Sequence, residues 1–480
     1  MRADPRKIFR RPLPVSLPLP LLITLALAGC AGFSNDGGMD RVSALSKERI
    51  GHALPSAEAQ REGKDRLQSL LAAPLTPDTA VEIALLNNPR LQVSLAELGI
   101  AEADLVQAGR MRNPRFSFGR LSGNGEVEID RAVLFDLSGL LTMPLRRAIE
   151  EKRFSQAQLQ TALQTVRLAT DTRRAYFQAV AAKQSLVYMQ QVGVAAEASA
   201  ELAKRMAKAG NWGKLEEARE QAFRAEVMAQ LSRTGHAERA ARERLVRLLG
   251  LSDEHTALKL PERLPDLPAA VDTTTQVEAR ALSQRLDVRV AKLDAESTAR
   301  SLGLTRATRF VNVLEAGYQN KSATGMSRAD GYEVELSLPV FDWGTARVKR
   351  AEATYMRSVH RTAEIAVQAR SEVRESWSAY ESSYRVARQY RDDVVPAKKR
   401  VSDEVLLRYN GMLASVFELL ADARSQIASI NAAIEAQRDF WVAEAELQYA
   451  VHGGSPTAAL PTAGAGSAGA AAATSAAASH

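Results

Sequence analysis

Cysteine is almost missing from this chain, since Cys30 is the only one in 480 residues. A single cysteine excludes a disulfide within the chain. Aromatic residues are also few, at 5%, although 46% of residues are hydrophobic and 25% are charged. Ala, Leu, Gln, Glu and Arg dominate instead. This composition favours long helices over the compact α/β body typical of an enzyme.

The residue patterns of catalysis and metal binding are missing as well. The six histidines are dispersed without paired spacing on a helix face: His52, His236, His255, His360, His452 and His480. No phosphate-binding loop or nucleophile elbow is present. Glu333 and Glu335 could form a carboxylate pair, but their position on one polar strand face favours contact with water. The sequence therefore predicts a protein that is not an enzyme, with no catalytic residue, metal ligand or cofactor.

Long blocks of like charge are also lacking. The net charge is +7, but acidic and basic residues are interspersed along the predicted helices. Such a pattern is typical of a solvated helical surface rather than of a groove for nucleic acid. We therefore expect no nucleic-acid partner.

The N-terminus has the pattern of a secretory signal peptide. Basic residues from Arg2 to Arg11 precede a short apolar run that is too short to span a membrane comfortably. The run ends in Leu27-Ala28-Gly29-Cys30, which resembles a bacterial lipobox, in which the cysteine is lipidated. The alternative is a buried, inert cysteine. We expect a signal peptide over residues 1–29, a lipidated segment over 30–75 and, because Ala31 rather than Asp follows, an outer-membrane destination.

The rest of the chain repeats itself. Residues 85–119 align without a gap with residues 282–316 at an offset of 197, and residues 170–179 align with 371–380 at an offset of 201. The two offsets differ because the strand-like segments between them vary in length. We expect a first repeat over 76–250, a connector over 251–275, a second repeat over 276–452 and a disordered tail over 453–480.

Each repeat is predicted to contain a helix, two strands, a very long helix and a returning helix. Thr76 and Pro77 form a helix start, and Pro89 predicts a break after Asn88. Residues 145–209 contain no proline, so they predict a helix of about 65 residues, roughly 100 Å long. Its partner over 345–410 is interrupted at Pro396. The returning helices are predicted over 214–249 and 413–449.

The predicted strands have one apolar face and one polar face. In GYEVELSLPVFDWG, residues 331–344, Tyr332, Val334 and Leu336 alternate with Glu333 and Glu335. Four such strands, each of about ten residues, match the length that crosses an outer membrane. Four strands cannot close a barrel, and open edges in lipid would leave backbone groups unpaired. The pattern therefore predicts that copies pool their strands, and three copies would supply twelve.

Two motifs, SLPVFDWG at 337–344 and RYNGMLASVFELLADAR at 408–424, together with the duplication and the lipobox, resemble the TolC-type outer-membrane channel family. The resemblance covers about residues 75–450. It implies a homotrimer: a twelve-stranded barrel in outer-membrane lipid, continued by a helical barrel through the periplasm. It also implies two partners, a periplasmic adaptor protein and an inner-membrane transporter. The fold class is thus mainly α with a membrane β-barrel contribution of four strands per chain, and the function is passive conduction in an efflux or type I secretion system.

The resemblance also suggests functional residues at the helical tips. Adaptor docking falls on two turns, at Gly210 and Asn211 and at Gly411, Met412 and Ser415. In the second turn the glycine lies one position early, so Met412 occupies the place where the family usually has glycine. Arg408, Tyr409 and Glu418 are implied as residues that narrow the periplasmic aperture. The alternative for Glu418 is an ordinary solvated carboxylate in the first turn of a helix.

Two other functions remain open from the residues alone. A lipid-anchored periplasmic adaptor would also use long helical hairpins, but only one, beside β-rich domains. A lipid-anchored coiled-coil scaffold would need no amphipathic strands. The matched repeats and the strands favour the channel over both, while the cargo is not specified by any motif.

Overall fold

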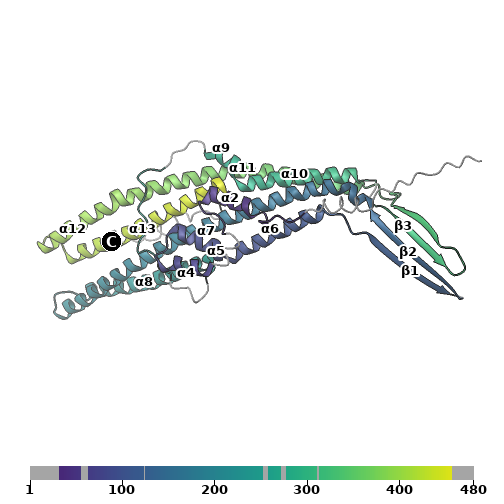
Figure 1. Cartoon of the computed structure of the whole chain (residues 1–480). Helices are drawn as coiled ribbons and strands as arrows, with labels where there is room; N and C mark the ends of the chain where they lie inside the picture. The colour runs from purple at the N-terminus through teal and green to yellow at the C-terminus, as the bar shows by residue number, and fades with distance from the viewer. Residues whose placement is uncertain are drawn as a thin grey trace, which may run out of the picture. The chain divides into compact units, whose positions relative to one another are not determined.

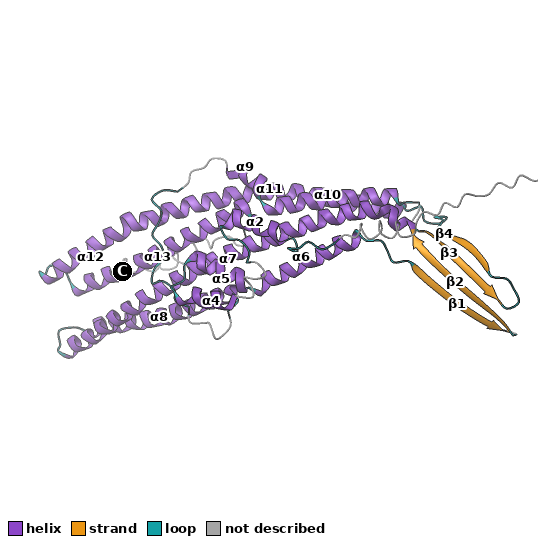
Figure 2. Ribbon diagram, viewed as in Figure 1, coloured by secondary structure: helices purple, strands orange, loops and turns teal. Residues whose placement is uncertain are grey.

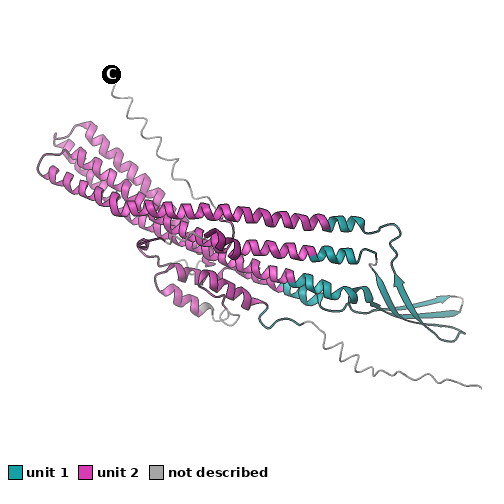
Figure 3. Ribbon diagram, turned by 90° about the horizontal axis from the view of Figure 1, so that it is seen from above, with its two compact units in different colours: residues 1–37, 100–151, 300–351 teal, residues 38–99, 152–299, 352–480 magenta. Residues whose placement is uncertain are grey.

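The computed structural model describes residues 32–55, 63–123, 125–251, 258–271, 277–310 and 313–456. The expected signal peptide, Cys30 and the chain beyond residue 456 lie outside these residues. The chain divides into two compact units, coloured separately in Figure 3. Unit 1 comprises residues 1–37, 100–151 and 300–351, and unit 2 comprises residues 38–99, 152–299 and 352–480.

The first repeat follows two short N-terminal helices, α2 (Met39–Ile50) and α4 (Gly63–Ala72). Its elements, labelled in Figure 1, are α5 (Pro77–Asn87), α6 (Pro89–Ala108), β1 (Arg115–Gly123), β2 (Glu126–Asp136), α7 (Leu137–Lys208) and α8 (Lys214–Leu249). The second repeat comprises α9 (Val277–Gln284), α10 (Leu286–Ala307), β3 (Leu314–Ala323), β4 (Ala329–Leu336), α11 (Thr345–Gln389), the π-helix η2 (Tyr390–Val394), α12 (Val395–Asn410) and α13 (Val416–His452). The predicted order of elements is confirmed in both repeats.

The start and end of the first helix follow from local chemistry. The Thr76 hydroxyl accepts a hydrogen bond from the backbone N–H of Thr79, and the Thr79 hydroxyl accepts one from the N–H of Thr76. Pro77 follows at the first helical position, where a missing N–H costs nothing. The helix ends at Asn87, before Pro89, so both predictions from the sequence are confirmed.

The long helices tolerate proline better than the sequence suggests. Helix α7 has 72 residues and begins at Leu137, so it includes Pro144. In the second repeat, the predicted interruption at Pro396 is a change of helix type rather than a gap. The five-residue π-helix η2 precedes it, and α12 continues directly with Pro396 in its first turn. A π-turn accommodates one extra residue without breaking the helix.

The four strands of unit 1 form one antiparallel sheet in the order β1-β2-β3-β4, shown in orange in Figure 2. The central β2–β3 pair joins the two repeats. Strand lengths are 9, 11, 10 and 8 residues, close to the predicted ten. Strand β4 ends at Leu336, although apolar alternation continues to Val340. Pro339 has no N–H to donate to a ladder, which is consistent with this early end.

Unit 2 consists of long helices, and the buried apolar side chains among its described residues form three clusters. Helices α2, α4 and α5 pack against one side of α7, where the Tyr176 hydroxyl donates to the Leu75 carbonyl at 2.9 Å. The described part of the connector, residues 258–271, runs over α11 and α13. Tyr384 donates to the carbonyls of Pro268 and Ala269, and Trp441 donates to that of Pro265. These bonds fix the connector between the repeats.

In the first repeat the end of α8 contacts the start of α6, and in the second repeat the end of α13 contacts the start of α10. We call these contacts the first and second junctions. At the first junction, the Asn88 amide donates to the Leu248 carbonyl at 2.6 Å, and the Asn87 amide donates to that of Gly250 at 2.6 Å. At the second, the N–H groups of Leu286 and Asp287 donate to the Gly453 carbonyl. Gly453, assigned to the tail from the sequence, is thus part of the folded unit.

Candidate functional site

The sheet of unit 1 separates apolar and polar side chains onto opposite faces. One row of paired residues crosses all four strands as Phe116, Val133, Tyr318 and Tyr332. Tyr332 is 93% exposed and Phe116 is 66% exposed in a single chain. On the other face, Glu333 pairs with Gly317, and Glu335 pairs with Glu315. The alternation predicted for β4 therefore continues into the neighbouring strands, with exceptions at Leu121 and Leu134 on the polar face and Arg120 on the apolar face.

One row on the apolar face is polar. Arg131, the exception in the apolar pattern of β2, pairs with Asn320, which in turn pairs with Asp330. The Arg131 guanidinium donates to the Asn320 side-chain oxygen at 3.1 Å, and the Asn320 amide donates to Asp330 at 2.5 Å. The Tyr318 hydroxyl also donates to Asp330. These bonds give Arg131, Asn320 and Asp330 polar partners within the sheet.

Among the described residues, the outer strands of the sheet are paired on one side only. Strand β1 pairs with β2 and strand β4 pairs with β3, and β1 and β4 are not paired with each other. The free sides carry backbone donors and acceptors beside exposed apolar side chains. Such an edge is a template for pairing with another strand. The sheet is thus incomplete in one chain.

The FDWG motif forms the turn between β4 and α11. The Asp342 carboxylate accepts a hydrogen bond from the Gly344 N–H at 2.8 Å, and the Trp343 carbonyl accepts one from the Arg309 side chain at 2.8 Å. Phe310 and Trp343 meet edge to face, with ring centroids 6.4 Å apart. The motif therefore has a structural role as a tight turn, with Phe341 99% exposed beside it.

The two hairpin turns of unit 2 have related geometry with different residues. In the first, Gly210 is left-handed with φ 78°, and the Asn211 N–H donates to the Met206 carbonyl. In the second, Gly411 has φ −82° and Met412 is left-handed with φ 59°. The left-handed residue therefore lies at the position that the resemblance predicted for glycine. A side chain in this conformation costs about 1 kcal/mol relative to glycine.

The residues predicted at the second turn mainly form bonds at the ends of the adjoining helices, α12 and α13. The Ser415 hydroxyl accepts a hydrogen bond from the Glu418 N–H at 3.2 Å, which makes Ser415 the N-cap of α13. Arg408 pairs with Glu404 at 3.0 Å on its own helix. In the described part of one chain, no side-chain bond joins Arg408, Tyr409 and Glu418. They are close in sequence around one turn but are not linked to each other.

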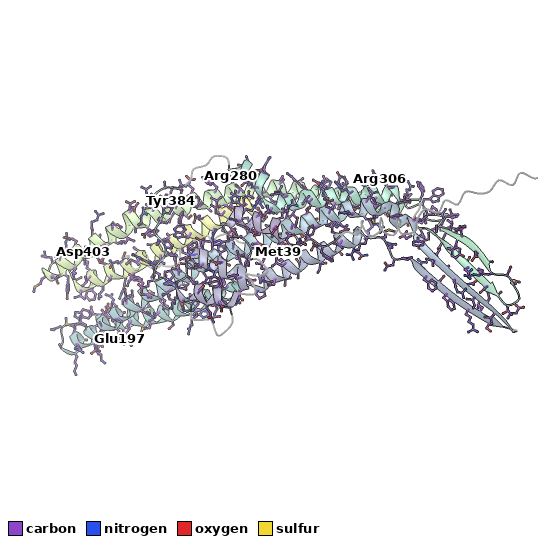
Figure 4. All side chains as sticks on the ribbon, in the orientation of Figure 1. Met39, Glu197, Arg280, Arg306, Tyr384 and Asp403 are labelled. Carbon is purple, nitrogen blue, oxygen red and sulfur yellow. The ribbon has the colours of Figure 1, made fainter. Side chains whose placement is uncertain are left out.

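The structure adds a connection between the hairpins that the sequence did not reveal. Glu220 on α8 is only 2% exposed and accepts hydrogen bonds from Ser199 on α7 and Arg424 on α13. The Arg424 guanidinium also lies 4.2 Å from the centre of the Phe223 ring. Nearer the turns, Trp212 stacks on Phe417 at 5.7 Å. Figure 4 marks the two hairpins by Glu197 and Asp403.

A second feature missed from the sequence is a cluster of charges where α7 meets α13. Arg174 pairs with Glu446 at 2.8 Å and with Asp171 at 3.5 Å. Burial raises the pKa of Glu446, although Arg174 opposes the rise. Burial likewise raises the pKa of Asp171 against the opposing charges of Arg174, Arg167 and Arg90. These groups look like ordinary surface charges in the sequence, because nothing local shows that another helix covers them.

Among the described residues, no group of three or more His, Cys, Asp or Glu side chains could hold a metal ion. Within the same residues, no helix is both long enough and apolar enough to cross a membrane.

Comparison with known proteins gives matches in structure but not in sequence. No family model and no curated protein matches the chain. The CmeC outer membrane channel of Campylobacter jejuni aligns with a TM-score of 0.69 and 15% identity, covering 80% of this chain and 87% of CmeC. The open state of the MtrE outer membrane channel of Neisseria gonorrhoeae aligns with a TM-score of 0.63 and 17% identity, covering 82% of this chain and 91% of MtrE. The outer membrane protein VceC of Vibrio cholerae aligns with a TM-score of 0.63 and 18% identity, covering 83% of this chain and 99% of VceC.

These similarities define the fold. The chain has the architecture of the outer-membrane channel proteins, with two helical repeats that contribute two strands each to one sheet. The fold class expected from the TolC-type resemblance is therefore confirmed. Because the sequence identities are only 15–18%, the comparison establishes the fold alone.

Proposed function

We propose that this protein is the outer-membrane channel of a tripartite efflux or type I secretion system and conducts its cargo passively. The observation that carries the proposal is the open-edged sheet, on which Phe116, Tyr318 and Tyr332 of the apolar row are exposed in a single chain. Lipid would cover that face, and water in a lumen would solvate the opposite one. The shared fold with CmeC and MtrE, both outer membrane channels, supports the same function.

The working form is a homotrimer. Each chain has four strands and two unpaired edges, and pairing β4 of one copy with β1 of the next satisfies both. Three copies give a closed barrel of twelve strands, wide enough for a water-filled lumen. Closure removes the edges, which would otherwise cost several kcal/mol for each unpaired backbone group in lipid.

The hairpin turns are the docking sites for a periplasmic adaptor, which connects the channel to an inner-membrane transporter. Met412 and Leu413 support this role, since they are 94% and 82% exposed at the second turn. Exposed apolar side chains at a helical tip are suited to contact with another protein. Gly210 and Asn211 provide the matching surface at the first turn, and Gly411 and Ser415 shape the second.

The aperture is controlled by Arg408, Tyr409 and Glu418 acting between copies, since they do not bond to one another within one chain. Lipidation of Cys30 anchors the N-terminus in the outer membrane. An acyl chain contributes about 0.8 kcal/mol per buried methylene, so several chains would hold the segment firmly. The protein thus spans the outer membrane and extends into the periplasm.

Detergent extraction tests the assembly. The channel should be extracted from membranes as a trimer that changes its gel mobility on heating. A water-soluble monomer would reject the proposal and leave the adaptor or scaffold. Val334→Lys places a charge on the apolar face and should reduce the trimer, since a lysine facing mid-membrane lipid costs about 2–4 kcal/mol. Glu335→Lys, on the polar face of the same strand, is the matched control and should leave the trimer intact.

Conductance in planar bilayers tests the aperture. Glu418→Ala should raise the open fraction of the purified channel, because it removes a charge at the narrow end. Glu226→Ala removes an exposed carboxylate of α8 away from the turn and should have no effect. Unchanged opening in Glu418→Ala would remove Glu418 from the gate.

A further inference from the structure

The first junction is lined by more arginine side chains than the nearby carboxylates can pair with. Two cavities of about 640 and 210 Å³ meet there, beside the start of α6 and the end of α8. Both are lined by Arg90 and Asp171, and their other charged side chains are all arginines. The five arginines are Arg90, Arg167, Arg174, Arg244 and Arg247. Asp171 is the one carboxylate that lines either cavity.

The negative charges at hand do not balance this set. Asp171 lies 3.5 Å from Arg174 and 3.9 Å from Arg167, and Arg174 also pairs with Glu446. Arg244 donates to the neutral Gln178 amide at 3.2 Å. Arg90 and Arg247 are exposed and make no ion pair among the described residues. The N-terminal end of α6 adds a partial positive charge on the same side.

The second repeat shows that this surplus is not a requirement of the architecture. At the offset of 197, Asn88 and Arg90 correspond to Arg285 and Asp287. At the offset of 201, Arg174 corresponds to Glu375. Two of the cavity arginines are therefore carboxylates in the second repeat. The second junction is instead filled by the fully buried Arg285.

The cavities also open on a defined side of α7. Asp171, Arg174 and Gln178 are spaced three and four residues apart, so they share one face of the helix. Arg173 and Tyr176 lie on the other side, where they bond to Asp78 and Leu75 beneath the N-terminal helices. The cationic cavities therefore lie on the face that these helices leave uncovered. In the proposed channel, this uncovered face is available to line the lumen.

We propose that the first junction is a binding site for anions that carry clustered phosphate or carboxylate groups. This inference rests on the proposed function for its biological role, since the site would hold anionic cargo on its way through the channel. Arg90 from α6 and Arg247 from α8, which both line the larger cavity, contact the ligand. The planar guanidinium group suits both phosphate and carboxylate, because it can donate two parallel hydrogen bonds.

Binding is measured on the purified full-length protein in detergent, by isothermal titration with inorganic pyrophosphate and with citrate. We expect saturable binding of one anion per chain. The double variant Arg90→Gln/Arg247→Gln should weaken it at least about tenfold, since it removes two charged hydrogen-bond donors from the cavity. Asp171→Asn removes the opposing carboxylate and should tighten binding several-fold.

The matched control is Arg370→Gln, which removes an exposed arginine of α11 that lines neither cavity. It should leave the affinity for both anions unchanged. The absence of saturable binding would overturn the site. An equal loss of affinity in the control would do the same, because it would show a general effect of net charge.

Ion selectivity in planar bilayers separates the site from the channel. A potassium chloride gradient should give a reversal potential that shifts toward cation preference in the double variant and not in the control. Anion binding without any conductance would keep the site and reject the proposed channel. Conductance with an unshifted reversal potential in the double variant would support the proposed channel. It would contradict the proposed effect of the anion site on what the channel conducts.

Discussion

The two junctions perform the same task with different chemistry. At the first, the side-chain amides of Asn88 and Asn87 donate to the carbonyls of Leu248 and Gly250, at the C-terminal end of α8 and just beyond it. At the second, the relation is reversed: the Gly453 carbonyl, beyond the end of α13, accepts from the first N–H groups of α10. Both solutions meet the requirement that groups at a buried helix end find a partner.

The charges at the two junctions differ even more. Arg285 is fully buried and donates to Asp287 at 2.7 and 3.0 Å and to Glu372 at 2.8 Å. Burial alone would lower the pKa of Arg285, but the two carboxylates outweigh it and raise the pKa. The first junction has Asn88 at this position and open cavities beside it. Duplication has thus kept the contact between the two helix ends, while one copy closed its junction with an ion pair and the other left room for a ligand.

Removing Arg285 should have the largest effect on stability. Arg285→Met leaves Asp287 and Glu372 close together without their shared partner, and breaking a buried ion pair costs about 3–5 kcal/mol. Chemical denaturation of the full-length protein, followed by helical circular dichroism, should show this loss. Arg374→Met is the control, because Arg374 is exposed and lies 3.8 Å from Glu278. Equal effects of the two variants would show that the second junction does not depend on the buried pair.

Removing the Asn88 amide should have a smaller effect at the first junction. Asn88→Ala leaves the Leu248 carbonyl and the Arg90 N–H without the partners they have at 2.6 and 2.8 Å. Unsatisfied buried groups cost about 1–3 kcal/mol, less than an uncompensated charge. The same denaturation experiment measures the loss. Asn211→Ala, in an exposed turn, should cost less, and a loss as large as that of Asn88→Ala would argue against a special role for the first junction.

The sequence predicted those parts of the fold that depend on neighbouring residues. Thr76, Pro77 and Pro89 determine where α5 starts and stops, and these effects act within a single turn. The repeat appeared because its elements recur at nearly constant offsets. The faces of β4 appeared because alternation is a local property of a strand. The early end of β4 was missed, since apolar alternation alone does not show where pairing stops.

The rest of the candidate site depends on contacts between distant parts of the chain. Glu220 and Arg424 are 204 residues apart, and neither position has a pattern that distinguishes it from solvated helix charges. Arg285 aligns with a neutral asparagine, so the repeat itself gave no reason to expect a buried cation. Arg131 interrupts the apolar alternation of β2, and only the fold places Asn320 beside it and Asp330 beside Asn320. Such groups are recognised only when the fold is known.

The two hairpin turns allow a milder test of how the repeats differ. Met412→Gly relieves a side chain from the left-handed conformation that Gly210 adopts without cost in the first turn. We expect a gain of about 1 kcal/mol, measured by thermal unfolding of the full-length protein. Gly210→Ala should cost a similar amount, because it introduces the same strain in the first repeat. A loss of stability in Met412→Gly would mean that the exposed methionine side chain contributes more to the turn than its backbone costs.

The smallest expected effect is on the pH dependence of stability. It concerns Asp171 and Glu372, which occupy corresponding positions in the two repeats at the offset of 201. Burial raises the pKa of Asp171 above its ordinary value of 3.8, so the folded chain binds this proton more tightly than the unfolded chain. Ionised Asp171 therefore lowers stability at neutral pH. The penalty disappears as pH falls through the raised pKa toward 3.8, because the carboxyl is then protonated in the folded chain.

Asp171→Asn should accordingly be slightly more stable than the wild type at pH 7, and this gain should shrink as the pH is lowered toward 4. Glu372→Gln should behave oppositely at pH 7, because it removes a 2.8 Å ion pair with Arg285 and lowers stability. Denaturation midpoints of both variants across this pH range measure the contrast. If Asp171→Asn lost stability at pH 7 as Glu372→Gln does, the arginines around Asp171 would outweigh its burial, and the two junctions would be electrostatically alike.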